Sequence, residues 1–244
     1  PAAALNAKYA ELRPKLTNNQ FQKPLYLESS ESANKQLVGD VYAVLNHPFA
    51  TAAPALSDAG NWWHNLILPA NTKYSRVGGG ERGKVLDVRI SRKADQAVEQ
   101  AYQVQFSHQV AAQTADFLKV QLGANEGPLG TRDYRIVLSA IPIEGDRTFI
   151  HLSYSYSTGT MGRMAMQMYL GSAGKDKVGF TETQGSLVGG MRGVIERNSM
   201  RYYLGIEAFL GALSAPPQAQ IGKRLADWFA ATEGYPRQLH EMGE

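Results

Sequence analysis

One long amphipathic stretch, residues 189–213, constrains the fold more than any other part of the chain. Two glycines begin it and Ala215-Pro216-Pro217 follow it, which are common start and stop signals of a helix. At about 100° per residue its apolar side chains fall on one stripe, opposite Arg192, Glu196 and Glu207. The stripe consists of Met191, Val194, Ile195, Tyr202, Gly205, Ile206, Phe209 and Leu213. The sequence therefore predicts one long helix whose apolar side packs against another layer of the protein.

Two polar residues interrupt this stripe, Asn198 in its middle and Arg201 at its margin. Asn198 fits either a core amide that is hydrogen-bonded to neighbouring backbone or a polar anchor inside a ligand cavity. Ligand cavities are mostly apolar and contain a few placed polar groups, so the second interpretation is chemically sound. The helix is therefore a candidate wall of a ligand-binding site.

Composition narrows the function classes. Of the 244 residues, 43% are hydrophobic and 19% are charged, which is typical of a globular protein with a substantial core. The net charge of +3 comes from scattered basic residues, so nucleic acid is not an expected partner. No apolar run approaches the length of about 18 residues that a membrane-spanning helix needs. The chain has no cysteine, which excludes disulfides, thiolate metal sites and cysteine nucleophiles.

The chain starts with Pro1-Ala2-Ala3-Ala4 rather than with Met. An alanine-rich start fits a chain that follows a signal-peptidase site. From this pattern we expect an exported protein that is located in the periplasm.

Three regions are expected along the chain: an N-terminal helical extension (1–24), a main domain (25–214) and a C-terminal helical tail (215–244). Apolar residues recur at helical spacing in 4–16 and again in 221–231, which supports a helix in each terminal region. No internal repeat or low-complexity segment interrupts this organisation.

The first part of the main domain is predicted to hold one strand and two short helices. Residues 25–29 have the pattern of a strand. The apolar residues between 39 and 46 fall on one side of a helix, so a helix is predicted there. His47-Pro48-Phe49 interrupts that pattern, and a second helix is predicted at 51–58.

Alternating apolar and polar residues then predict an antiparallel meander with one covered face. Its strands are expected at 85–91, 101–110, 117–122, 134–141 and 148–156. A short helix carrying Met161, Met164 and Met168 follows, and then a Gly-rich segment at 171–190. Adaptable Met side chains fit core packing, a lid over a hydrophobic ligand or a transient membrane contact.

This order of elements, with a Val41-Tyr42-Ala43-Val44-Leu45 helix and the later Trp62, resembles the START, Bet v 1 and polyketide cyclase (SRPBCC) superfamily. More narrowly, it is similar to uncharacterised exported bacterial START-like proteins. The resemblance covers about residues 25–213 and implies an α+β helix-grip fold. In that fold a curved antiparallel sheet wraps around a long C-terminal helix, and an apolar ligand lies between them. The helices at both ends and the Met-rich insertion are departures from the simple fold.

The candidate site residues are aromatic or polar side chains expected on the inner face of the sheet or on the long helix. His108 lies on the apolar face of its strand, whereas His151 has the opposite parity to its apolar neighbours. Each phenol or imidazole also fits an ordinary hydrogen-bonded core residue. The ligand-binding candidates are Trp62, Tyr102, Phe106, His108, Tyr134, Tyr154, Asn198, Arg201, Tyr202 and Phe209.

Three functions remain open from the sequence. The first is binding or carrying of a hydrophobic small molecule, lipid-like or polycyclic, without a cofactor or metal. The second is an enzyme of the cyclase or dehydratase kind, with His108 as base and Tyr102 as acid. The third is a protein-interaction module without a ligand cavity.

Several familiar catalytic patterns are absent. There is no Gly-x-Ser-x-Gly elbow and no His-x-x-x-His metal spacing. Residues 78–84 come close to a phosphate-binding loop, but Val85 stands where Ser or Thr is needed, so a hairpin turn is predicted instead. The chain is not expected to be an enzyme of these classes, and its oligomeric state is left open.

Overall fold

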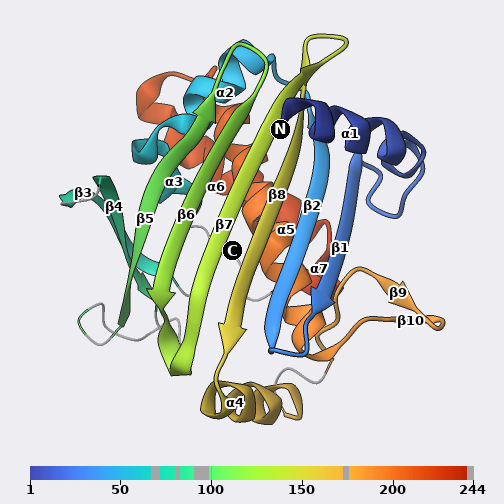
Figure 1. Ribbon diagram of the computed structural model, residues 1–244, viewed down its shortest axis with the longest axis vertical. Coiled ribbons are helices and arrows are strands. Elements are labelled where there is room, and N and C mark those ends of the chain that lie inside the picture. The colour runs from blue at the N-terminus through green and yellow to red at the C-terminus, as the bar shows by residue number, and fades with distance from the viewer. Residues whose placement is uncertain (67–71, 81–82, 91–98, 100, 173–175, 241–244) are drawn as a thin grey trace.

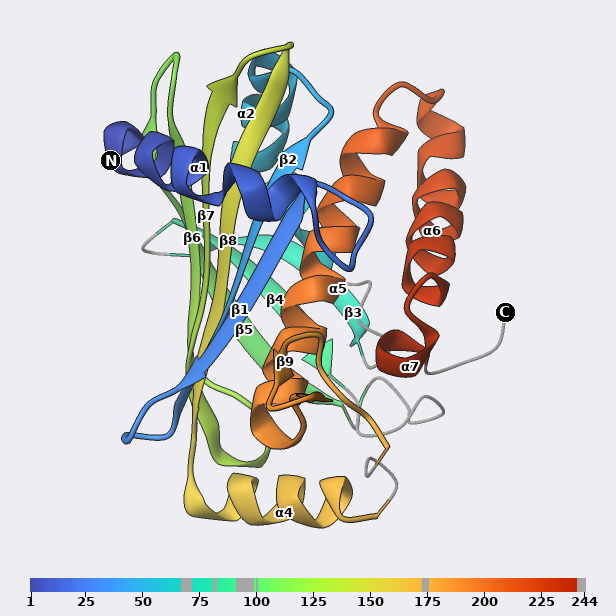
Figure 2. The ribbon, with the colours of Figure 1, turned by 90° about the vertical axis from the view of Figure 1, so that its right-hand side faces the viewer.

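The computed structural model describes residues 1–66, 72–80, 83–90, 99, 101–172 and 176–240. Within these residues one antiparallel sheet of eight strands dominates, in the order β1-β2-β8-β7-β6-β5-β4-β3. It curves around the long helix α5 (Figure 2). The strands are β1 (Leu25–Glu31), β2 (Gln36–Leu45), β3 (Thr72–Gly80), β4 (Gly83–Ile90), β5 (Tyr102–Gln113), β6 (Leu118–Glu126), β7 (Thr131–Ile143) and β8 (Arg147–Thr158).

Helices cover both faces of this sheet. Helix α5 (Gly190–Ala212) lies on the inner face, where α2 (Phe49–Ser57) and α3 (Ala59–Leu66) also pack, and α6 (Pro217–Glu233) lies beyond α5 (Figures 1 and 2). Helix α1 (Ala2–Thr17) crosses the outer face. The short elements are the 3-10 turn η2 (Pro128–Gly130), α4 (Thr160–Leu170), the hairpin of β9 (Glu182–Thr183) and β10 (Ser186–Leu187), and α7 (Pro236–Leu239). No helix in the described ranges is long and apolar enough to span a membrane.

Two hydrophobic cores follow from this layering. The larger core lies between the inner face and α5, and it includes Val41, Leu138 and Ile195. The smaller core lies between the outer face and α1, where Leu12 and Phe149 are completely buried. Because side chains alternate between the two faces of a strand, the central strands contribute to both cores. The expected α+β helix-grip fold, with extra helices at its ends, is confirmed.

The prediction of a helix at 39–46 is wrong, because these residues belong to β2, which pairs with β1 and β8. Val41, Ala43 and Leu45 face the inner core, while Tyr42 and Val44 are buried under α1. A strand that is buried on both faces reads as a continuous apolar run, which periodicity alone does not separate from a helix. The resemblance therefore stands on the order of the elements and not on a helix at this motif.

The hairpin predicted around residues 78–84 is confirmed. Strands β3 and β4 pair antiparallel, with Gly80 opposite Gly83, and the chain continues from Lys84 as a strand rather than as a helix. Residues 81–82 lie outside the described part. Without a helix N-terminus after Lys84, the amide groups that a phosphate-binding loop presents are not available here.

The prediction that the side of the long helix opposite the apolar stripe is polar and uncovered is only partly correct. Glu196 is completely buried, because it lies between the edge strand β1 and residues 179–181. Its Oε2 atom accepts the backbone N–H groups of Phe180 at 2.6 Å and Thr181 at 2.9 Å. Its Oε1 atom accepts the hydroxyl of Ser29 at 2.6 Å. Glu196 therefore fastens residues 180–181 to α5 and β1.

Candidate functional site

Aromatic side chains gather between the inner face of the sheet and α5. Tyr134 from β7 stacks on Tyr156 from β8, with ring centroids 5.3 Å apart. Tyr154, also on β8, lies 5.7 Å from the Tyr156 ring and 5.1 Å from the ring of Tyr202 on α5. Phe106 on β5 meets Tyr134 edge-on at 6.2 Å. Alternation along the strands explains this aromatic cluster, since all four strand residues point to the inner face.

The hydroxyl groups of the aromatic cluster differ in their partners. The Tyr134 hydroxyl donates to Thr131 Oγ1 at 2.7 Å. No hydrogen bond joins the hydroxyls of Tyr154, Tyr156 and Tyr202 to another described residue, and these three oxygens are not among the fully buried polar atoms that lack a partner. The rings of Tyr154 and Tyr156 are buried and Tyr202 is partly buried, but their hydroxyl oxygens are open to a solvent molecule or a ligand. They provide hydrogen-bonding capacity that the described protein does not use.

Burial keeps these phenols neutral. It raises the pKa of Tyr134 to about 12, although the hydrogen bond with Thr131 opposes the shift. Burial also raises the pKa of Tyr154, Tyr156 and Tyr202 well above the ordinary phenol value, and the neighbouring tyrosines add to it. At neutral pH each group is therefore an O–H donor, suited to an acceptor such as a carbonyl oxygen.

Only some of the candidate ligand-binding residues on α5 lie beside the aromatic cluster. Asn198 lies one helical turn before Tyr202 and so shares its side of the helix. Its Oδ1 atom accepts a long hydrogen bond from Arg201 at 3.4 Å. Phe209 packs elsewhere, with the Arg224 guanidinium of α6 5.1 Å from its ring centre. Asn198 is thus placed beside the aromatic cluster, whereas Phe209 belongs to the contact between α5 and α6.

Trp62 and Tyr102 occupy contrasting positions. Trp62 on α3 is buried, and its Nε1–H donates to the carbonyl of Leu56 at 2.7 Å, as expected for a satisfied core residue. Tyr102 begins β5 and is 42% exposed. It lies six positions before His108 on the same strand, a separation of about 20 Å at 3.3 Å per residue. The structure therefore does not bring the two residues of the proposed acid–base pair together.

His108 is partly buried and lies near the middle of β5, whereas Tyr102 begins that strand. Its neighbour across the strand pair is Lys84, whose ammonium lies 3.7 Å from the Asp58 carboxylate. The Nε2 atom of His108 is buried without a hydrogen-bond partner among the described residues. Burial, followed by the charge of Lys84, lowers the His108 pKa below its ordinary 6.5. The imidazole is consequently neutral at pH 7.

The lowered His108 pKa has a consequence for stability. Below pH 6.5 the unfolded chain takes up a proton at this site while the folded chain resists it, so stability falls as the pH drops. We expect His108→Gln to flatten the loss of stability between about pH 7 and about pH 5, by at most about 1.4 kcal/mol per pH unit. Urea unfolding at a series of pH values measures it. An unchanged slope would contradict the assignment.

His151 lies on the outer face, as its parity predicts. Its Nε2 atom is 2.7 Å from Asp40 Oδ1, and its ring stacks on Tyr42 with centroids 4.3 Å apart. The sheet therefore separates His151 from His108 and from the aromatic cluster. Within the described residues, no group of three or more His, Asp or Glu side chains has the geometry to hold a metal ion.

No family model matches the chain, and no curated protein matches its sequence. Among solved structures, it is similar to norcoclaurine synthase from Thalictrum flavum, with 15% identity and a TM-score of 0.41 over 72% of this chain and 98% of that one. A protein from Thermus thermophilus has 12% identity and a TM-score of 0.43, again over 72% and 98%. A protein from Arthrobacter aurescens has 12% identity and a TM-score of 0.41 over 77% and 92%. The arrangement of the elements in this chain is the helix-grip arrangement that its sequence resembles.

Proposed function

We propose that the protein binds or carries a hydrophobic small molecule, lipid-like or polycyclic, between the inner face of the sheet and α5. The observation that supports this most directly is the set of three neighbouring tyrosine hydroxyls, on Tyr154, Tyr156 and Tyr202, without partners among the described residues. They are neutral donors embedded in aromatic surface.

The energetics favour a ligand with an apolar body and one polar acceptor. Burial of the apolar body contributes about 25 cal/mol per Å² before the costs of binding. A ligand acceptor that takes a hydrogen bond from one of these hydroxyls contributes about 0.5–1.5 kcal/mol net. Carbonyl-bearing ring systems and lipid-like molecules combine both properties.

Native mass spectrometry of the purified protein, compared with denaturing mass spectrometry of the same sample, tests this function. A mass excess that disappears on denaturation would identify the size class of the bound molecule. A protein of bare mass that also fails to bind an added neutral ring system would contradict the proposal. A suitable probe is prodan, an uncharged naphthalene dye with one ketone oxygen and environment-sensitive fluorescence.

We expect the double variant Tyr154→Phe/Tyr202→Phe to bind prodan about tenfold more weakly, which corresponds to about 1.4 kcal/mol. Both substitutions keep the ring and remove only a hydroxyl without a protein partner, so the free energy of unfolding should change little. Tyr42→Phe is the matched control, because Tyr42 is a buried tyrosine on the outer face. Equal weakening by both variants would argue against recognition by the aromatic cluster.

A cyclase or dehydratase activity is the second candidate, and His108 favours it. A neutral imidazole with an unpartnered, buried Nε2 atom is equipped to accept a proton. The two functions separate experimentally, because His108→Gln should leave prodan binding intact in both cases. For an enzyme, the same variant would stop conversion of the co-purified molecule.

A further inference from the structure

A pocket of about 480 Å³ lies on the outer side of the sheet, away from the aromatic cluster. It is formed by α1, the segment that follows α1, β2 and the turn between β7 and β8. Its apolar walls are Leu16, Pro24, Val44 and the ring of Tyr9. Its volume falls in the range of about 300–1,000 Å³ that is usual for small-molecule sites. The eight-stranded sheet separates it from the inner-face site.

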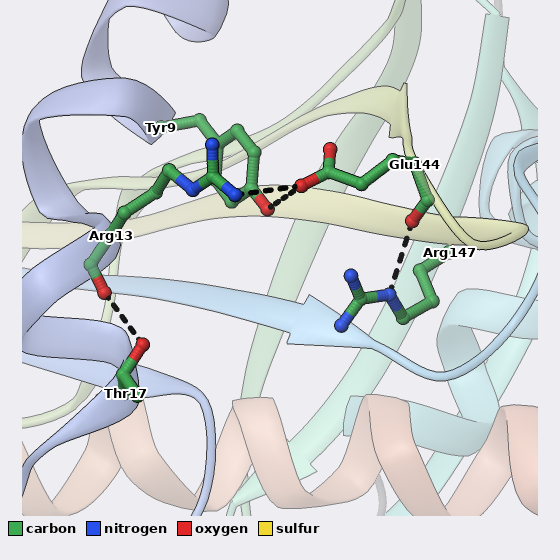
Figure 3. A network of polar contacts seen from close by, with 5 residues as sticks. All are labelled: Tyr9, Arg13, Thr17, Glu144 and Arg147. Atoms are coloured by element: carbon green, nitrogen blue, oxygen red, sulfur yellow. Dashed lines mark hydrogen bonds and ion pairs between the residues drawn. The ribbon is translucent and has the colours of Figure 1, made fainter.

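The charges in this outer pocket are unevenly paired. Its lining includes three cationic side chains, Arg13, Lys23 and Arg147, and one carboxylate, Glu144. Arg13 donates to Glu144 Oε1 at 3.2 Å, and the Tyr9 hydroxyl donates to the same oxygen at 3.2 Å (Figure 3). Lys23 pairs with Glu207 of α5 at 2.6 Å. Two of the three cations therefore have a carboxylate partner.

Arg147 is the cation that remains. Its Nε–H donates to the backbone carbonyl of Glu144 at 3.1 Å, which fixes the plane of the guanidinium. Its two terminal nitrogens make no ion pair or hydrogen bond within the described part of the chain. Figure 3 shows them pointing from the β7–β8 turn toward α1, across the space between Arg147, Arg13 and Thr17. After a backbone hydrogen bond, the charges of Arg13 and Arg147 also help to lower the pKa of the Glu144 carboxylate, so the two arginines share one carboxylate and leave one net positive charge at the pocket.

We propose that this outer pocket binds a small amphiphilic monocarboxylate, with its carboxylate on Arg147 and its apolar body against Leu16, Pro24 and Val44. A guanidinium presents two parallel N–H donors that match a carboxylate. The three cations and the two carboxylates Glu144 and Glu207 leave one net positive charge, which a single negative charge neutralises, and this favours a carboxylate over a doubly charged phosphate. The apolar residues of the lining, Leu16, Pro24 and Val44, favour a ligand with a hydrocarbon portion. This site is independent of the proposed inner-face function.

Methyl NMR of the intact protein tests this inference, with octanoate, 1-octanol and inorganic phosphate as probes. Octanoate should shift the methyl signals of Leu16 and Val44 saturably. Octanol, which lacks the charge, should bind at least about tenfold more weakly. Arg147→Gln should weaken octanoate binding by about tenfold or more, and Arg132→Gln should leave it unchanged. Arg132 is the matched control, because its exposed side chain on β7 lies outside the pocket.

Several results would overturn the inference. Octanol and octanoate could bind equally well, or Arg147→Gln could bind octanoate as strongly as the unchanged protein. Phosphate could shift the same methyl signals as strongly as octanoate. The Leu16 and Val44 signals could also remain unshifted by octanoate. Prodan binding separates this site from the inner-face site. It should be unaffected by Arg147→Gln, so the failure of one proposal leaves the other standing.

Discussion

Glu196→Ala is expected to lower the free energy of unfolding by about 3–5 kcal/mol. The carboxylate is completely buried and accepts three hydrogen bonds, two from the amides of Phe180 and Thr181 and one from Ser29. Removing it leaves those donors buried without an acceptor, and a cavity forms beside them. Urea unfolding measures the loss.

Glu182→Ala is the matched control for this change. Glu182 is an exposed carboxylate on β9, close in sequence to the amides that Glu196 holds. Its removal should change stability by less than about 0.5 kcal/mol, as for ordinary surface substitutions. A loss below about 1 kcal/mol for Glu196→Ala would mean that the buried carboxylate does not anchor residues 180–181.

Gly39→Ala is expected to cost about 2–3 kcal/mol, because β2 and α5 approach each other closely at this position. A Cβ atom on Gly39 would lie 2.3 Å from Ser199 Oγ and 3.2 Å from the carbonyl oxygen of Ile195. The first contact is far below any normal separation, so the Ser199 side chain, the helix or the strand must move. Thermal or denaturant unfolding reports the loss.

A double-variant cycle with Ser199→Ala tests the cause. Removing the Ser199 hydroxyl relieves the shortest contact, so the double variant should regain part of the stability lost by Gly39→Ala. Losses that simply add would contradict the steric explanation. Gly222→Ala on α6 is the control, since a Cβ there meets no atom within 4 Å. It should be neutral or slightly stabilising, because alanine is the better helix former.

The sequence is most informative where one period persists over many residues. The long helix predicted at 189–213 is α5, and the alternating segments are β4 to β8 within a few residues at each end. In most of these strands one face is buried and the other is wetter, so the alternation follows the burial directly, and in α5 the apolar stripe is regular enough to show the helical period. The β2 segment fails for the opposite reason, because α1 buries the face that would otherwise be polar.

The burial of Glu196 differs from the prediction for a related physical reason. Helical periodicity places it opposite the apolar stripe, and a helix with one covered side would expose it. Residues 176–188 have a polar, Gly-rich sequence with no apolar pattern, so nothing in them indicates that they cover α5. The burial of Glu196 depends on a contact between segments, and periodicity within one segment does not encode it.

The candidate sites show the same limit. Parity along β5, β7 and β8 is sufficient to place Phe106, Tyr134 and Tyr154 on one face. Parity does not give position along the strand, which is why Tyr102 shares that face and still lies far from His108. No local sequence pattern indicates the outer pocket. Its residues Arg13 and Arg147 are far apart in the sequence, and only the fold brings them together.

Helix α5 combines two roles that other proteins divide between different elements. It carries Asn198 and Tyr202 beside the aromatic cluster, and nearly all of its remaining residues are packed between the sheet, residues 176–188 and α6. A substitution that reshapes the ligand contact on this helix therefore disturbs close-packed neighbours as well. Evolutionary change in ligand preference is for this reason expected to accumulate on the strands, where a side chain can be altered without moving the central helix.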